Sequence, residues 1–444
     1  MTNKLDDPVT RAIPRGRAAR FGQFGRLAGG VAGGMLAEGA RRLADGERPQ
    51  LRDLILTPGN VARVTERLSH LRGAAMKLGQ MVSMDAGDVL PPELSQIMAR
   101  LRDQAYHMPP AQLQMVLNAE WGEGWRRHFA LFNPRPVAAA SIGQVHSAQT
   151  RDGRDLAIKV QYPGIRESID ADVDNVATLL KVSGLLPAGL DFAPLLEEAK
   201  RQLAEEADYL REANQLDGYR KQLAVDAGYL VPALEPQFTT RNVLAMTFVE
   251  GRPIESLETA PQATRNAVMT SLFDQVLREL FDLGVMQTDP NFANYRFDPA
   301  SNRLILLDFG ACRAITREIR QRYRQLLQAG LAEDRDTIRH AAVAAGFMSG
   351  TAAETHRPAV NRMIDTILVH LGRPGPLDFA DRSFVTALQA DGATIVADRA
   401  AWHLPPAEML LVQRKISGTA LLAARLKAQV DIRAMVEAKL AALD

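Results

Sequence analysis

An apolar run that ends in an aspartate constrains this chain most strongly. Residues 304–307 read as a buried strand, and Asp308 follows directly as the first residue of a D-F-G tripeptide. Asn294 stands fourteen positions before Asp308, and Asp289 five positions before Asn294. A buried strand delivers the residue that follows it to a site at its end. Because magnesium prefers carboxylate and carbonyl oxygen, Asn294 and Asp308 are the predicted metal ligands.

The spacing of these residues is that of a kinase catalytic loop. In the pattern D-x-x-x-x-N the aspartate, here Asp289, faces the phosphate acceptor. Upstream, residues 157–160 reproduce the V-A-I-K pattern and place Lys159 on a strand after a hairpin, where a lysine can pair with phosphates. Lys159 alone would be read as an edge-strand lysine that reaches solvent. The order of all three parts favours the phosphate role.

The chain departs from ordinary protein kinases in three places. An alanine-rich segment, predicted to cover the phosphates, replaces the usual glycine-rich loop, and it should be stiffer because alanine lacks the positive-φ freedom of glycine. The residues of this segment assigned to nucleotide binding are Ala138, Ala139, Ala140 and Ser141. Gln-Thr stands before Asp289 in place of His-Arg. After Cys312 the chain soon enters a helical pattern without an A-P-E motif, which leaves little room to cradle a peptide.

These departures resemble the UbiB (AarF-domain) family of atypical kinases, specifically its mitochondrial coenzyme Q branch and the bacterial relatives of that branch. The resemblance runs from about residue 15 to residue 435. The matching segments are Lys77–Gln80 (K-x-G-Q), Ala138–His146, Lys159 with Gln161–Gly164, Glu206–Tyr209 (E-x-D), Glu212–Asn214, Gln287–Asn291 and Asp308–Ala311.

The resemblance implies an α+β, protein-kinase-like bilobal fold with a small β-rich N-lobe and a mostly helical C-lobe. It adds an N-terminal helical K-x-G-Q subdomain that packs across the site where a peptide would bind. It implies that Glu212 pairs with Lys159, and that Lys77, with Gln80 in the same motif, approaches the nucleotide and Glu206. Without the resemblance, Lys77 reads as a surface lysine. Glu206 and its neighbours read as a solvated helix face or as a site for a second cation.

The adenine base is expected on the segment that a kinase uses as its hinge. That segment is assigned to Met246, Thr247, Phe248 and Val249, although Met246 is also expected to face the core in any fold. The predicted domains are a basic, Gly/Ala-rich leader, a helical K-x-G-Q extension, a kinase-like N-lobe with a helical insertion, and a helical C-lobe. Their boundaries are 1–50, 51–130, 131–250 and 251–444.

The leader contains an uncharged run, residues 27–37, that as a helix is too short to cross a bilayer. Its repeated G-x-x-x-G spacing and flanking arginines favour an interfacial membrane anchor, with a flexible leader as the alternative. Lys and Arg number 53 against 52 Asp and Glu, a net charge of +1, so nucleic acid is not an expected partner. Cys312 is the only cysteine, which excludes an internal disulfide. The eight histidines show no metal-ligand spacing.

We therefore expect a Mg²⁺-dependent atypical kinase or ATPase that uses ATP and, by the resemblance, supports ubiquinone biosynthesis at a membrane. Its partners would be ubiquinone-pathway enzymes or lipid intermediates, with membrane lipids bound peripherally; a homodimer is left open. Its location would be the inner face of a bacterial-type membrane, on the cytoplasmic side, or the matrix side in an organelle. The alternative is a nucleotide-gated scaffold or lipid-extracting chaperone without turnover. A protein kinase acting in trans is a third, weaker hypothesis.

Overall fold

The computed structural model describes residues 107–140, 142–182, 193–224, 228–289, 291–398 and 406–443. Two units make up the chain. The first comprises Met1–Asp217 and Ala233–Phe248, and the second comprises Gly218–Pro232 and Val249–Asp444.

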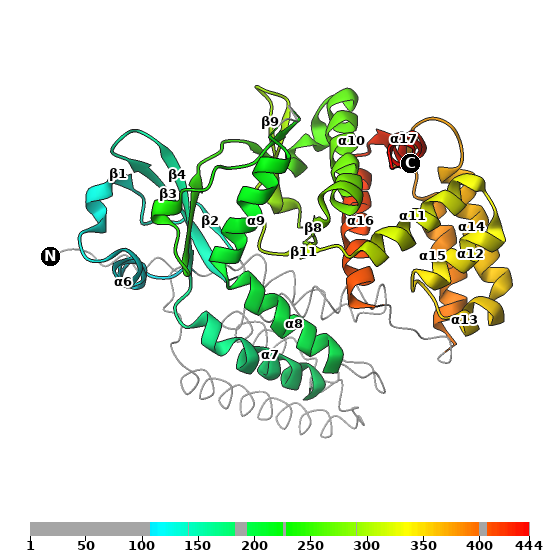
Figure 1. Ribbon diagram of the computed structural model, residues 1–444, viewed down its shortest axis with the longest axis horizontal. Coiled ribbons are helices and arrows are strands. Elements are labelled where there is room, and N and C mark those ends of the chain that lie inside the picture. Colours follow the sequence, from blue (N-terminus) through cyan, green and yellow to red (C-terminus); the bar gives the residue numbers. More distant parts are fainter. Residues whose placement is uncertain are drawn as a thin grey trace, which may run out of the picture. The chain divides into compact units, whose positions relative to one another are not determined.

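The first unit is built on an antiparallel sheet (Figure 1). Its strand order is β1-β3-β4-β6, and β2 also pairs with β3. The strands are β1 (Phe129–Phe132), β2 (Ala138–Ala139), β3 (Gly143–Thr150), β4 (Asp155–Gln161) and β6 (Val243–Thr247). The predicted hairpin is confirmed: β3 and β4 pair from Gly143↔Gln161 to Gln149↔Asp155. Gly153 turns the chain between them with φ of 86°, a conformation that favours glycine.

One face of this sheet is covered by an aromatic core. Leu156, Ile158 and Val160 alternate along β4 and are fully buried against it. On the other side of this core lie α6 (Pro110–Trp121), the short helix η3 (Trp125–His128) and η4 (Pro236–Phe238). Trp121 stacks on Phe129 with ring centroids 5.5 Å apart. The alternation of β4 leaves its intervening residues, Lys159 among them, on the opposite face.

Three helices complete the first unit in the region predicted to be helical. They are α7 (Ile165–Val182), α8 (Ala193–Glu206) and α9 (Tyr209–Gln222), whose last residues belong to the second unit. Figure 1 shows α7 and α8 side by side as a helical hairpin. The Asp208 carboxylate accepts a hydrogen bond from the Arg211 backbone N–H at 3.2 Å and so caps the first turn of α9. This cap helps to fix where α9 begins.

The second unit combines short strands with a mostly helical remainder. Its strands are β5 (Tyr229–Leu230), β7 (Arg252–Pro253), β8 (Val285–Gln287), β9 (Tyr295–Asp298), β10 (Arg303–Leu306), β11 (Cys312–Ala314), β12 (Leu377–Asp378) and β13 (Gln429–Val430). Its α-helices are α10 (Gln262–Arg278), α11 (Arg317–Ala332), α12 (Arg335–Ala344), α13 (Gly350–Thr355), α14 (Arg357–Leu371), α15 (Ser383–Val396), α16 (Ala407–Arg425) and α17 (Ile432–Ala441). Shorter turns are η5 (Ile254–Thr259), η7 (Phe292–Asn294) and a π-helical turn, η6 (Glu279–Leu283), that extends α10.

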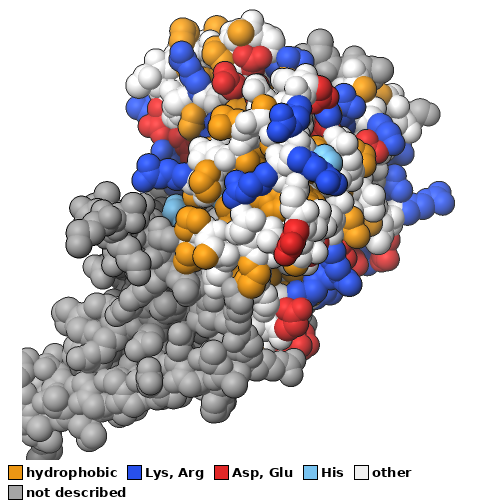
Figure 2. Space-filling view, turned by 90° about the vertical axis from the view of Figure 1, so that its left-hand side faces the viewer, with side chains coloured by type: hydrophobic (Ala, Val, Ile, Leu, Met, Phe, Trp, Pro, Cys, Tyr) orange, Lys and Arg blue, Asp and Glu red, His pale blue; other side chains and the backbone are white. Residues whose placement is uncertain are grey.

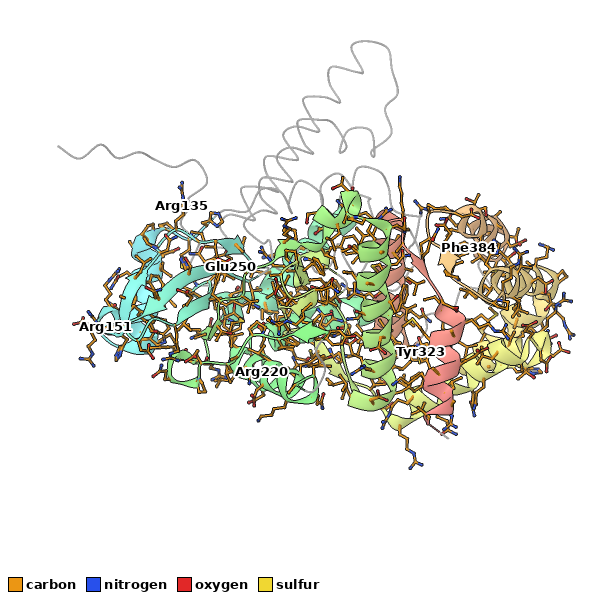
Figure 3. All side chains as sticks on the ribbon, turned by 90° about the horizontal axis from the view of Figure 1, so that it is seen from above. Arg135, Arg151, Arg220, Glu250, Tyr323 and Phe384 are labelled. Carbon is orange, nitrogen blue, oxygen red and sulfur yellow. The ribbon has the colours of Figure 1, made fainter. Side chains whose placement is uncertain are left out.

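Helices α10, α11 and α16 meet in one apolar cluster of the second unit. Val276 of α10, Tyr323 of α11 and Val412 of α16 are all buried in it. Figure 1 shows α10 and α16 side by side, and Tyr323 lies beside α16 in Figure 3. The strands order as β5-β10-β9-β7 in one small sheet and pair as β11-β8 and β12-β13 in two others. Through the apolar cluster, α16 packs against α10 and its extension η6, which leads into β8.

The outer face of the first unit carries apolar side chains among charged ones (Figure 2). Arg126 lies over the Trp125 ring at 4.7 Å, and Leu131 is 64% exposed. Arg135 and Arg151, labelled in Figure 3, are exposed at the edge of this unit. Both signs of charge appear on this face, in keeping with the balanced composition of the chain.

Candidate functional site

Two loops of the second unit carry the predicted metal residues, and backbone pairing holds both loops at both ends. On one side β9 pairs with β10, where Tyr295 is opposite Leu306. On the other side β8 pairs with β11, where Gln287 is opposite Cys312. The loops of residues 288–294 and 307–311 are therefore anchored next to each other at both of their ends.

Two further hydrogen bonds join the loops between these ladders. The Leu307 backbone N–H donates to the Asn294 carbonyl oxygen at 3.0 Å. The Thr288 hydroxyl donates to the Ala311 carbonyl oxygen at 2.7 Å. Asn294 is thus tied to the residue just before Asp308, which is what a shared ligand site requires.

Asn294 and Asp289 are also linked directly. The Asn294 side-chain N–H donates to the carboxylate of Asp289 at 3.2 Å and to its carbonyl oxygen at 3.3 Å. Asn294 is buried, 7% exposed, at the end of η7. The amide nitrogen is thereby held on Asp289, and this orientation turns the amide oxygen of Asn294 away from that carboxylate.

Asp308 is fixed by the turn that it opens. One of its carboxylate oxygens accepts from the Gly310 backbone N–H at 3.0 Å. Phe309 is buried beneath the turn and packs on Tyr219, with ring centroids 4.9 Å apart. Tyr219 was not among the predicted site residues, since a tyrosine on an amphipathic helix gives no separate signal.

The donor set of these loops fits magnesium. Asn294 supplies an amide oxygen and Asp308 a carboxylate, both hard ligands, and magnesium commonly binds one or two such groups while keeping several waters. Within the described ranges no three His, Cys, Asp or Glu residues gather as a metal cluster. The predicted metal ligands of the two loops are thus one amide oxygen and one carboxylate.

The first unit contains the lysine that is predicted to bind phosphate. Lys159 of β4 donates to both carboxylate oxygens of Glu212 in α9, at 2.9 and 3.0 Å. The pairing implied by the family resemblance is therefore present. The Lys159 ammonium also lies 5.2 Å from the centre of the Tyr209 ring. Its side chain is 10% exposed, against 1% for Glu212.

The alanine-rich segment forms a tight hairpin with the start of β3. Ala138 pairs with Val145 and Ala139 with Gln144, and the Ala140 N–H donates to the Gly143 carbonyl oxygen at 2.9 Å. A side chain at Gly143 would meet the Val160 carbonyl oxygen at 2.5 Å, so only glycine allows this approach to β4.

A buried polar chain anchors this hairpin. Gln144 accepts a hydrogen bond from the Met108 backbone N–H at 2.8 Å, and its amide nitrogen lies 2.9 Å from His146 Nε2. The other ring nitrogen of His146, Nδ1, lies 2.9 Å from the Asn133 carbonyl oxygen. Burial lowers the pKa of His146 to about 4, so the ring is neutral at neutral pH. A neutral ring that accepts from Gln144 and donates to Asn133 satisfies both contacts.

Other predicted nucleotide residues lie as follows. Met246 is buried in β6, as expected, and Phe248 is 36% exposed. The Thr247 hydroxyl accepts from the Ala233 backbone N–H at 2.8 Å, and Val249 begins a segment of the second unit. Glu206 is the last residue of α8 and partly exposed. Lys77, Gln80 and Ser141 lie outside the described residues, as does the predicted membrane-interacting leader.

A second buried lysine, Lys415 of α16, was missed by sequence reasoning. Its ammonium lies 3.2 Å from Glu279, 3.1 Å from the Gln287 side-chain oxygen and 2.9 Å from the Tyr295 hydroxyl. The available signal was its register: Lys415 follows Val412 by three positions and precedes Leu422 by seven, on a helix face whose buried residues are mostly apolar.

Burial acts on both members of this ion pair, and it raises the pKa of Glu279 above its ordinary value although the Lys415 ammonium opposes that shift. Burial alone lowers the pKa of Lys415, but the Glu279 carboxylate and the Tyr295 hydroxyl outweigh it and raise that pKa above its ordinary value. Burial raises the pKa of the Cys312 thiol well above its usual range, so Cys312 stays a thiol at neutral pH.

Comparisons with known proteins agree with this geometry. A family model described as the ABC1 atypical kinase-like domain matches residues 100–342. The chain is 36% identical over 433 residues to the atypical kinase COQ8, mitochondrial, of Saccharomyces cerevisiae, covering 96% of this chain and 85% of that protein. It is 36% identical over 429 residues to the atypical kinase COQ8B, mitochondrial, of Rattus norvegicus, covering 95% and 80%.

The prediction of an α+β, kinase-like fold is confirmed as well, whereas most of the predicted K-x-G-Q subdomain lies outside the described residues. The solved complex of Rv3197 with erythromycin from Mycobacterium tuberculosis matches with a TM-score of 0.61 at 25% identity, covering 85% of this chain and 94% of that one. None of the helices described here combines the length and apolarity that a membrane crossing requires. With more than half of its length matched by the family model and near-complete coverage by relatives, the chain belongs to the ABC1, or UbiB, family of atypical kinase-like proteins.

Proposed function

We propose that this chain binds ATP with Mg²⁺ and catalyses transfer or hydrolysis of the terminal phosphate. The observation that carries the proposal is the clamped pair of loops, which holds Asp289, Asn294 and Asp308 together in one unit. Membership of an atypical kinase-like family supports the same chemistry.

Each residue has a role in this proposal. Asn294 and Asp308 would hold Mg²⁺, which when bound neutralises charge that develops on the phosphate. Asp289 orients or deprotonates the acceptor, and its bond from Asn294 fixes its direction. Lys159 contacts phosphate oxygens, and Glu212 orients it through two hydrogen bonds. The hairpin of residues 138–144 covers the phosphates, and the hinge segment at 246–249 holds the adenine.

The acceptor is proposed not to be a peptide bound in trans. The helix α11 begins at Arg317, capped by Thr316, and β11 occupies residues 312–314 between it and the D-F-G motif. This short, paired segment supports a small-molecule or water acceptor. By the family resemblance, we place the activity in coenzyme Q biosynthesis, peripherally at a membrane. The mitochondrial atypical kinases named above are consistent with that placement.

The proposal is tested by Asp308→Asn and Asp289→Asn, with Asp298→Asn at the end of β9 as a control carboxylate in the same unit. Asp308→Asn should abolish Mg²⁺-dependent ATP turnover, because Asp308 is proposed to hold the metal ion. Asp289→Asn should reduce turnover by about a hundredfold or more, because Asp289 is proposed to act on the acceptor. Asp298→Asn should retain wild-type turnover. Unchanged turnover in both test variants would refute the proposal.

The same variants decide between turnover and ligand-gated scaffolding. In a strain that depends on this chain for coenzyme Q, loss of the quinone with Asp289→Asn while nucleotide binding is retained supports turnover. If Asp289→Asn keeps quinone levels while Asp308→Asn removes both nucleotide binding and quinone, bound nucleotide acts as a ligand and not as a substrate.

A further inference from the structure

The catalytic loop of the second unit is closed at its base by side chains that the proposed chemistry does not use. Gln287 immediately precedes the segment 288–294, and Tyr295 immediately follows it. The Tyr295 hydroxyl donates to the Gln287 side-chain oxygen at 3.2 Å. This bond joins the two ends of the loop.

Lys415 completes the closure from a distant part of the chain. Its ammonium donates to the Gln287 side-chain oxygen at 3.1 Å and to the Tyr295 hydroxyl at 2.9 Å. The two contacts span 128 and 120 residues of sequence. One cation on α16 therefore contacts both ends of the loop that carries Asp289 and Asn294.

Glu279 supplies the counter-charge and adds a backbone contact. It lies in the π-helical turn η6, is 0% exposed, and pairs with Lys415 at 3.2 Å. It also accepts from the Gln287 backbone N–H at 3.4 Å and from the Tyr219 hydroxyl at 3.1 Å. Tyr219 packs on Phe309, so the cluster also supports the second loop through the D-F-G turn.

Apolar packing alone would not need this arrangement. A buried ion pair contributes little net stability over a well-packed apolar pair, and one use of such groups is to select a single conformation. Groups that orient metal ligands from behind commonly change metal affinity when they are removed. The π-helical turn is also typical of functional positions.

We infer that Lys415 is a positioning residue, which together with Glu279 locks the ends of the segment 288–294 so that Asn294 and Asp289 are held for metal and acceptor. The metal role of that loop rests on the proposed function. Lys415 itself touches no reacting group in this assignment; it acts through Gln287 and Tyr295.

The test uses a matched pair of double variants in the full-length chain. Lys415→Met with Glu279→Gln removes both charges and every donor at position 415. Lys415→Gln with Glu279→Gln also removes both charges but keeps an amide donor of similar size. In both, the amide introduced by Glu279→Gln retains an acceptor for Tyr219. The two differ only in whether residue 415 can donate to Gln287 and Tyr295.

Two readouts separate positioning from general stability. The first is amide hydrogen exchange of residues 288–294, with α14 as an internal reference. The second is the Mg²⁺ concentration that gives half-maximal ATP turnover. In the methionine double variant the exchange rate of this segment and the half-maximal Mg²⁺ concentration should each rise about tenfold, as expected when the residues that hold a metal ligand in place are lost. The glutamine double variant should stay within about threefold of wild type.

Val412→Ala is the control for stability, since it opens a cavity in the apolar cluster beside the same helix and removes no hydrogen bond. It should lower the melting temperature yet leave both readouts within about twofold. If the methionine double variant does not fold, Tyr295→Phe decides, because it keeps the ion pair and removes only the hydroxyl. Tyr295→Phe should raise both readouts at least about threefold, because it removes the hydrogen bond to Gln287 and the one from Lys415.

If the methionine double variant folds and the hydrogen exchange of residues 288–294 is unchanged in it, the inference is overturned. If the methionine double variant does not fold, unchanged exchange in Tyr295→Phe overturns the inference. An equal rise in Val412→Ala overturns it too, because the effect would then be general. If the wild-type chain shows no Mg²⁺-dependent turnover, the proposed function fails. The exchange measurement still decides whether Lys415 positions the loop.

Discussion

Each unit of this protein contains a buried lysine–glutamate pair, and the two pairs are built differently. In the first unit Lys159 makes two hydrogen bonds to one carboxylate, that of Glu212, and its side chain is 10% exposed. In the second unit the Lys415 side chain is 1% exposed and divides its contacts among Glu279, Gln287 and Tyr295.

The difference shows how one pair of residue types can serve two purposes. Lys159 lies beside a hairpin of small residues on the face of the sheet away from the aromatic core, and a carboxylate can share its ammonium with a phosphate. The contacts of Lys415 are to neutral and acidic groups on three elements, all of them buried. We therefore propose a binding role for Lys159 and a structural role for Lys415.

The largest expected change in stability follows from Lys415→Met. Glu279 would be left buried without its counter-charge, which costs about 3–5 kcal/mol in comparable cases. Native-state hydrogen exchange in α16 measures the free energy of opening. Adding Glu279→Gln should recover much of the loss, because the unpaired charge is removed. A loss below about 1 kcal/mol for Lys415→Met would mean that the pair is not closed to water.

Acid should weaken the first unit through His146. Its folded pKa of about 4 lies below the unfolded value of 6.5, so the unfolded state binds the proton more readily. The stability from neutral His146 is complete above pH 6.5 and falls as the pH drops toward 4. The total is about 3 kcal/mol at 1.36 kcal/mol per pKa unit.

Tryptophan fluorescence measures this effect, because Trp121 and Trp125 both lie in the first unit. Trp402→Phe removes the remaining tryptophan, which falls outside the described residues. The difference between His146→Gln and its parent isolates the histidine from other titrating groups. Parallel stability profiles of the two proteins between pH 6.5 and 4 would contradict the assignment.

A smaller change in stability is expected for Lys159→Met. Glu212 would lose the two hydrogen bonds from Lys159, but the pair is less enclosed, so the cost should be about 1–3 kcal/mol. ATP turnover should nevertheless be lost, which is the reverse of the pattern for a purely structural lysine. Lys200→Met is the control in the same unit: its partners Asp174 and Glu197 are exposed, and turnover should be unaffected. Retained turnover in Lys159→Met would break the contrast between the two pairs.

Much of the candidate site could be predicted from residues close in sequence. The spacing of Asp289, Asn294 and Asp308 depends on one loop, one strand and one turn, and the structure places these segments together. The partner of Lys159 came from the family resemblance, and their ion pair is present at 2.9 Å. Which residues bind metal, nucleotide or acceptor remains a prediction, and for Lys77 and Gln80 the described residues give no further information.

Lys415 could not be assigned in the same way. In sequence it is one cation in an amphipathic helix, more than 100 residues from the loop that it contacts. Its three partners come from a π-helical turn, the end of β8 and the start of β9, and no local pattern connects them. The hydrogen-bond networks of Tyr219 and His146 could likewise not be predicted from the sequence, because burial and hydrogen bonding depend on elements that are distant in sequence.

The sequence by itself determined the fold class, the family, and which carboxylate and amide residues the loops 288–294 and 307–311 carry. These follow from local strand and helix periodicity and from short motifs whose spacing is fixed by one turn or strand. Only the tertiary structure decided which charges are buried and what they contact. The reason is physical: the cost of burying a lysine, and the partners that offset it, depend on the surrounding packing of segments far apart in the chain.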